Sequence, residues 1–262
     1  MTTTPSTGPA LPGVSGAADR TQLAASLRTL RLSGMLDSLE NRLAQAAGGQ
    51  LGFLDFLQVL CLDEINRRDS AALERRTRAA KFETDGRIEN FDFTADPGIP
   101  AARIRDLANA EWVRTGQHVI ISGPVGTGKT HIATAFGHQA VRAGHTVRFA
   151  PTSRVLADLA GGHADGSWAK RLRAYTKPDL LILDDFAMRE FTPAQGDDLY
   201  EIVNERPARS IVVTTNRAPD QWYPLFPNQV VAESLLDRLV NNAHQITIQS
   251  GSYRARSRPT AH

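Results

Sequence analysis

Gly123-Pro-Val-Gly-Thr-Gly-Lys129-Thr130 is the stretch that decides the fold of this 262-residue chain. Residues 117–122 come directly before it and predict a short apolar strand, and a helical pattern follows it up to Gly144. Glycines let the backbone curl around a phosphate chain so that several N–H groups point inward, and the start of the helix adds its positive dipole end. The octapeptide therefore predicts a phosphate-binding loop between a strand and a helix.

The side chains of this loop suit a nucleoside triphosphate with its metal. Lys129 supplies a compact cation for the β- and γ-phosphates, and Thr130 offers a hydroxyl ligand to Mg²⁺. We therefore expect ATP and Mg²⁺ as cofactors. The residues expected to bind the nucleotide are Gly123, Pro124, Val125, Gly126, Thr127, Gly128, Lys129, Thr130 and His131.

Two acids end a second apolar run. Residues 180–183 are all aliphatic, as expected of a central parallel strand, and Asp184 and Asp185 follow them directly. In a P-loop enzyme the first acid holds Mg²⁺ through water and the second polarises the attacking water. The alternative is a pair of turn-forming acids at the end of a strand. The spacing of about 55 residues from the glycine loop favours the functional interpretation.

Two later residues are candidates for the same chemistry. Asn216 ends the apolar run 210–215, where a polar side chain can reach the γ-phosphate or the lytic water, although Asn is also a common turn former. Arg238 could reach the γ-phosphate of a neighbouring subunit as an arginine finger. From spacing alone, a surface salt bridge of Arg238 with Glu233 or Asp237 is favoured.

The order of elements predicts the domains. From residue 98 strands and helices alternate, which predicts an α/β domain with a parallel sheet flanked by helices. We expect one helix over 100–116 and two short helices separated by Gly161-Gly162. Before that domain, apolar residues recur at helical spacing. We predict a disordered tail over 1–18, a small all-helical domain over 19–85, the ATPase domain over 86–250 and a basic tail over 251–262.

Composition limits the class of protein. The single cysteine, Cys61, lies among leucines and is expected to be a buried small hydrophobe. No run of 18 apolar residues exists, so we expect no membrane span and a cytoplasmic protein. The net charge of +2 gives only weak support for a nucleic-acid partner.

One local segment is strongly basic. Residues 168–177 contain four cations and no acid: Lys170, Arg171, Arg173 and Lys177. On a helix Lys170 and Arg173 share a face, and Lys or Arg contacts to phosphate supply most non-specific DNA affinity. A solvated basic helix face explains the same pattern. Because no base-reading motif is visible, little sequence specificity is expected.

With these motifs in order, the chain resembles an AAA+ ATPase, and more narrowly the IstB family of ATP-binding helpers in insertion-sequence transposition. That family is related to the bacterial replicative helicase loader. The resemblance covers about residues 26–254. Its specific stretches are Leu32–Leu36, Leu73–Arg76, Arg78–Phe82, Asn90–Phe93, Gly123–Thr130, Leu183–Phe186, Thr215–Asp220 and Glu233–Leu239.

The resemblance implies a helical N-terminal domain joined to an AAA+ domain, ATP-dependent self-assembly on duplex DNA, and delivery of that DNA to a partner transposase. It also implies that Arg238 is the arginine finger and that an aspartate at position 185 is a variant compatible with activity. A helicase loader is the alternative function. A metabolic P-loop kinase would need a mobile arginine-bearing lid, which the sequence lacks, and a non-hydrolysing ATP-gated scaffold remains a further alternative.

Overall fold

The computed structural model of the chain describes residues 20–94 and 97–249. Contacts divide the chain into two compact units at Ala72/Leu73, within a single long helix. The boundary predicted at residue 85 between the helical and the ATPase domain stays a prediction. The tails predicted over 1–18 and 251–262 lie outside the described residues.

The N-terminal unit is helical, as expected. Its elements are α1 (Arg20–Thr29), α2 (Ser33–Ala47) and the first part of α3 (Phe53–Ala80). Leu27, Leu39 and Leu60 form the small core, one from each helix. Gly34 allows the helices to meet closely, because a Cβ there would lie 2.8 Å from Glu64 Cα. A small apolar core and a close helix contact thus hold this unit together.

The prediction that Cys61 is buried is wrong: its side chain is exposed. Leu60 faces the core, and the next residue on a helix points about 100° away. The apolar spacing predicts that one helix face is lined by Phe53, Phe56, Leu57, Leu60 and Ile65. Leu60 and Phe56 pack in the small core, whereas Phe53, Leu57 and Ile65 are exposed. Only a narrow stripe of α3 is therefore buried in the N-terminal unit.

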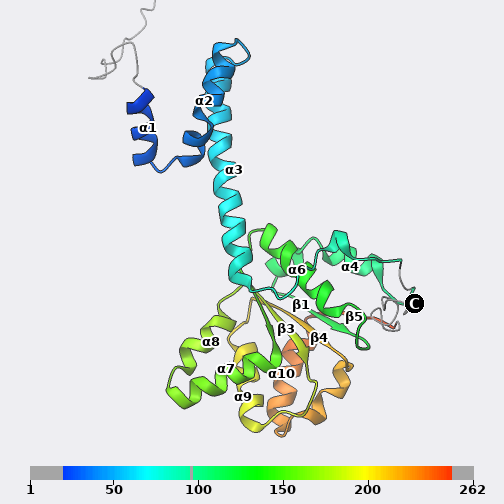
Figure 1. Cartoon of the computed structure of the whole chain (residues 1–262). Helices are drawn as coiled ribbons and strands as arrows, with labels where there is room; N and C mark the ends of the chain where they lie inside the picture. Colours follow the sequence, from blue (N-terminus) through cyan, green and yellow to red (C-terminus); the bar gives the residue numbers. More distant parts are fainter. Residues whose placement is uncertain (1–19, 95–96, 250–262) are drawn as a thin grey trace, which may run out of the picture. The chain divides into compact units, whose positions relative to one another are not determined.

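A parallel sheet forms the centre of the second unit (Figure 1). All four strand pairings are parallel, and the order across the sheet is β2-β3-β4-β1-β5. The strands are β1 (His118–Ser122), β2 (Val147–Pro151), β3 (Leu180–Phe186), β4 (Ser210–Thr215) and β5 (Ala243–Thr247). The predicted α/β class with a parallel sheet is confirmed.

Helices cover both faces of this sheet (Figure 1). One face packs against α4 (Ala101–Leu107), α5 (Glu111–Arg114) and α6 (Lys129–Arg142). The other packs against α7 (Thr152–Asp165), α8 (Trp168–Thr176), α9 (Pro193–Asn204) and α10 (Gln229–Asn241). Successive strand residues point to opposite faces, so Leu181 belongs to one core and Ile182 to the other. This two-sided burial explains why β3 is a continuous apolar run.

Single-turn 3₁₀ helices complete the second unit. They are η1 (Ile88–Asn90), η2 (Pro219–Gln221) and η3 (Tyr223–Leu225). The sequence Thr192-Pro-Ala-Gln195 predicts a capping box with proline at the first helical position. This capping box is present, since Thr192 and Gln195 exchange hydrogen bonds between side chain and backbone at the start of α9.

Two helix predictions are wrong. The helix expected over 100–116 is broken at Ala110, whose φ of 58° is left-handed, so that α4 and α5 are separate. Gly161-Gly162 does not interrupt α7, which continues to Asp165. A Cβ on Gly162 would lie 2.8 Å from Trp168 Cα, so this glycine serves the close packing of α8 against α7.

Candidate functional site

The glycine loop joins β1 to α6, as predicted. Gly128 precedes the first residue of α6 with a φ of 87°, and a Cβ there would lie 2.8 Å from Phe91 Cε2. Gly123 leaves β1 with a φ of 153°, and a Cβ there would lie 2.6 Å from Ile248 O. Both positions require glycine for conformation and for space. The loop backbone is therefore fixed by its neighbours.

Lys129 is buried at the base of this loop. Its Nζ donates hydrogen bonds to Gly123 O at 2.8 Å and to Pro124 O at 2.7 Å. The ammonium group thus lies on the inner side of the loop, bonded to carbonyl oxygens of the loop itself. A phosphate oxygen entering the loop would meet this cation together with the backbone N–H groups at the start of α6.

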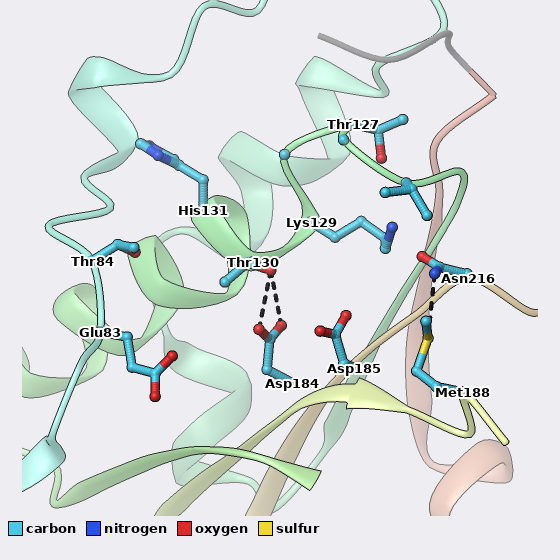
Figure 2. Close-up of a pocket in the computed structure, with 13 residues that line it drawn as sticks. Glu83, Thr84, Thr127, Lys129, Thr130, His131, Asp184, Asp185, Met188 and Asn216 are labelled. Carbon is cyan, nitrogen blue, oxygen red and sulfur yellow. Dashed lines mark hydrogen bonds between the residues drawn. The ribbon is translucent and has the colours of Figure 1, made fainter. Parts of the chain in front are cut away.

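Thr130 and Asp184 face each other across the pocket floor (Figure 2). Thr130 Oγ1 donates to the two carboxylate oxygens of Asp184 at 3.0 and 3.1 Å. Thr214 Oγ1 also donates to Asp184 Oδ1. Burial raises the pKa of Asp184 above its ordinary value; the hydrogen bond from Thr214 opposes this rise and the charge of Asp185 adds to it. A hydroxyl and a carboxylate facing each other fit a hard divalent cation, which prefers oxygen ligands.

Asp184 and Asp185 lie together in a β-bulge of β3. Leu183 pairs with Val213 and Phe186 with Thr215, so Asp184 and Asp185 together stand opposite Thr214. Asp185 has a left-handed φ of 53°, a conformation that costs about 1–3 kcal/mol for a non-glycine residue and is found at functional sites. The bulge turns the exposed Asp185 side chain toward the pocket (Figure 2), while Asp184 stays buried.

These residues line one pocket of about 520 Å³ (Figure 2). The structure brings together most of the predicted site: Val125, Gly126, Thr127, Gly128, Lys129, Thr130, His131, Asp184, Asp185 and Asn216. Gly123 and Pro124 contribute the carbonyls that hold Lys129. Asn216 Nδ2 contacts Met188 Sδ at 3.3 Å, at the side of the pocket near Asp185.

Three lining residues are absent from the sequence prediction: Glu83, Thr84 and Met188. Glu83 forms an ion pair with Arg154 at 2.8 Å, and it comes from the segment between α3 and η1. Nothing in the local pattern marks this segment as part of the pocket. The one available signal was the stretch Arg78–Phe82, which ends directly before Glu83.

Comparison with known proteins identifies the family of this chain. The model of the IstB-like ATP binding protein family matches residues 25–261. The chain belongs to this family.

The relatives come from insertion sequences. An insertion-sequence ATP-binding protein of Mycobacterium tuberculosis is 60% identical over 89% of this chain and 94% of its own length. The ATP-binding protein of insertion sequence IS21 from Pseudomonas aeruginosa is 32% identical over 92% of this chain and 91% of its own. The chain is thus a member of an insertion-sequence ATP-binding family.

Solved structures show the same AAA+ fold. The DnaC helicase loader superposes with a TM-score of 0.55 at 19% identity, over 65% of this chain and 100% of that one. AMPPCP-bound DnaA from Aquifex aeolicus superposes with a TM-score of 0.54 at 20% identity, over 64% of this chain. The match spans about half of the DnaA chain, 51%.

In this IstB-like chain Arg238 lies away from the pocket, on α10. Its guanidinium donates to Asn204 Oδ1 and lies 5.6 Å from the Tyr200 ring centroid. The side chain is exposed and lines a separate hollow with Asn204 and Arg206. Arg238 is therefore exposed and lies outside the pocket that contains Lys129 and Asp184.

The predicted DNA-binding residues of this IstB-like chain fall into two groups. Lys170, Arg173 and Lys177 are exposed on or directly after α8. Arg171 is partly buried and pairs with Asp158 at 2.9 Å and with Asp165 at 2.5 Å, so it joins α8 to α7.

The two aromatics of the basic segment point into the protein. Trp168 Nε1 donates to Asp198 and the Tyr175 hydroxyl to Asp158.

Within residues 20–94 and 97–249, no helix combines the length and the apolar character needed to cross a bilayer.

Proposed function

We propose that this chain is an ATP-hydrolysing assembly factor. It oligomerises on duplex DNA with little sequence preference and regulates or stimulates a partner transposase. The observation that carries the proposal is the hydrogen bond from Thr130 Oγ1 to Asp184 Oδ1, 3.0 Å long, beneath the glycine loop. This arrangement provides phosphate and metal ligands in one pocket, in a family of insertion-sequence ATP-binding proteins.

The pocket residues divide the chemistry between them. Lys129 and the loop N–H groups would hold the β- and γ-phosphates, and Thr130 and Asp184 would hold Mg²⁺. When bound, Mg²⁺ would supply positive charge against the phosphate oxygens. Asp185, whose side chain points into the pocket, would orient and polarise the attacking water, and Asn216, which lies beside Asp185 at the pocket wall (Figure 2), would face the γ-phosphate. The shorter side chain of Asp185, compared with glutamate, is compatible with slow turnover.

Hydrolysis in this scheme depends on a second copy of the chain. Arg238 lies outside the pocket of its own chain and is exposed. Delivered to the γ-phosphate of a neighbouring subunit, its guanidinium stabilises the charge of the transition state. Turnover is then coupled to self-assembly, because the isolated subunit lacks this group in its pocket.

DNA contact in this scheme uses phosphates. The exposed cations Lys170, Arg173 and Lys177 lie close together in the chain. The polar atoms of Trp168 and Tyr175 are engaged in part-buried hydrogen bonds within the chain, so the scheme assigns these side chains no contact with bases. Contacts to phosphate position a protein on DNA without reading its sequence.

The test uses the full chain with the Lys129→Ala variant. Wild-type protein should sediment as multimers on duplex DNA when ATP and Mg²⁺ are present, and the variant should not. Multimers of the variant that still respond to ATP on DNA would contradict the proposal. The control variant is Lys81→Ala, which changes a lysine outside the nucleotide pocket.

The helicase-loader alternative is supported by the fold shared with the DnaC helicase loader. The two functions differ in their partner. Stimulation of strand transfer by the transposase of the same element supports the first, and release of a helicase ring onto single-stranded DNA supports the second.

A further inference from the structure

Thr214 connects the two acids of the pocket. It lies in β4, fully buried, beneath the residues that line the pocket. Its hydroxyl donates to Asp184 Oδ1 and accepts from the backbone N–H of Asp185 at 3.0 Å. One hydroxyl group therefore holds the side chain of the first acid and the backbone of the second.

The β-bulge makes this bond necessary. Because Asp184 and Asp185 share a single opposite residue, the regular strand hydrogen bonds are interrupted there. The Asp185 N–H needs another acceptor, and the Thr214 hydroxyl is that acceptor. A residue with the shape of threonine but without its oxygen would leave the left-handed backbone of Asp185 without this support.

Thr214 also differs from the other hydroxyl at Asp184. Thr130 lines the pocket, where its oxygen can turn to a bound cation, whereas Thr214 is buried in the sheet. When Thr130 turns to a cation, the bond from Thr214 still fixes the rotamer of Asp184. Partners of this kind orient metal ligands without touching the metal.

We propose that Thr214 is a positioning residue: its hydroxyl fixes the positions of the metal-binding acid, Asp184, and the water-polarising acid, Asp185, relative to each other. The proposal rests on the proposed roles of Asp184 and Asp185 toward a magnesium nucleotide.

The decisive variant is Thr214→Val, which keeps the shape and removes both hydrogen bonds. Thr214→Ser keeps the hydroxyl and should restore function. The matched control is Thr134→Val, because Thr134 is equally buried and its hydroxyl has no hydrogen-bond partner among the described residues. The same isosteric change is thus made with and without loss of a hydrogen bond.

The first readout is Mn²⁺ binding to the protein–AMPPCP complex, with protein in excess so that little free AMPPCP remains to chelate Mn²⁺, measured from the free-Mn²⁺ spin-resonance signal. Thr214→Val should weaken Mn²⁺ binding about 10- to 100-fold, the usual effect of losing a partner that orients a metal ligand. AMPPCP binding in the presence of a chelator should be unchanged. Thr214→Ser and Thr134→Val should both match the wild type.

The second readout is steady-state hydrolysis. At a Mg²⁺ concentration that saturates the variant, Thr214→Val should lower kcat while KM for ATP stays near the wild-type value, because the loop that holds the phosphates is intact. Mn²⁺ binding by Thr214→Val equal to that of Thr134→Val overturns the proposal. If Thr214→Val fails to fold, Thr214→Cys, which has only a weak donor, replaces it, and unchanged Mn²⁺ binding there overturns the proposal equally. A wild type that binds Mn²⁺–AMPPCP but does not hydrolyse ATP contradicts the proposed ATPase and leaves the Mn²⁺ test of Thr214 valid.

Discussion

Two buried carboxylates, Glu64 in the N-terminal unit and Asp184 at the nucleotide pocket, are held in opposite ways. Glu64 accepts from Arg67 at 3.0 Å, from Arg68 at 2.6 Å and from the Gly34 N–H at 2.5 Å. The pKa of Glu64 is lowered to about 2, and the hydrogen bond from Arg67 makes the largest contribution to this shift. Asp184 accepts from hydroxyl groups, and burial raises its pKa.

We infer from this difference that Glu64 stabilises the fold, and we propose that Asp184 serves a ligand. Glu64 has its counter-charges within its own helix, so its charge is balanced when the chain folds. The charged form of Asp184 is disfavoured by its surroundings, and a bound cation would restore the balance. Four predictions test this contrast and the roles proposed for the exposed arginines and lysines.

The largest expected effect is that of Arg238→Ala. An arginine finger is worth about 10³- to 10⁵-fold in kcat, so hydrolysis by the assembled protein should fall by at least about 10³-fold. Nucleotide binding to the monomer should be unchanged because Arg238 lies outside the pocket. Turnover assays and fluorescent-nucleotide titrations measure the two effects. Mixing this variant with Lys129→Ala should recover part of the activity, and unchanged turnover in Arg238→Ala alone would leave the arginine a surface residue.

Asp184→Asn tests whether Asp184 binds the metal ion. Because a partner of a metal ligand alone is worth about 10- to 100-fold, loss of the ligand should raise the Mg²⁺ concentration needed for ATP binding by about 100-fold or more. The melting temperature should stay equal or rise, since a buried charge is removed. A Mg²⁺ titration and thermal unfolding give both values. A large fall in melting temperature would show that Asp184 stabilises the fold as Glu64 does.

Glu64→Gln tests whether the charge of Glu64 stabilises the N-terminal unit. The variant should destabilise the N-terminal unit and leave the Mg²⁺ requirement unchanged. The folded-state pKa of Glu64, about 2, lies below the ordinary value of 4.5. Its stabilising effect is therefore present above pH 4.5 and is lost as the pH falls toward 2. Hydrogen exchange of the Gly34 amide should be faster in the variant near pH 7, and the difference should shrink across this pH range. A pH-independent difference would contradict the charge argument.

The smallest effect is expected from Lys170→Ala combined with Arg173→Ala. Each phosphate contact adds about 0.9 to the slope of log affinity against log salt on duplex DNA, so the double variant should lower that slope by about 2. ATP binding should not change. Arg171→Ala is the contrast, because its ion pairs with Asp158 and Asp165 make loss of stability its main effect. An unchanged slope in the double variant would assign these residues to a solvated face.

Periodicity and motif order predicted the parallel sheet, the loop between β1 and α6, and the capping box at Thr192. The signals for these features are patterns among residues that are neighbours in the chain. The features that the sequence did not predict depend on contacts between distant residues. Gly162 was interpreted as a helix break because glycine disfavours helices, yet its close approach to Trp168 is a packing requirement.

The candidate site follows the same division. Residues from Gly123 to Thr130 and the acid pair were identified because their spacing along the chain carries the signal. Glu83 and Thr214 were not assigned roles, because their positions depend on the segment before η1 and on the register of β4 against β3. The Cys61 prediction failed because a leucine-rich neighbourhood in sequence does not say which side of a helix faces the core.

The bonds of Lys129 to Gly123 O and Pro124 O also bear on the shape of the glycine loop. A buried ammonium group without acceptors would face the full penalty of an unpaired charge. Here two carbonyls at the start of the loop accept from a side chain at its end, so the cation that suits a phosphate also ties the two ends of the loop together.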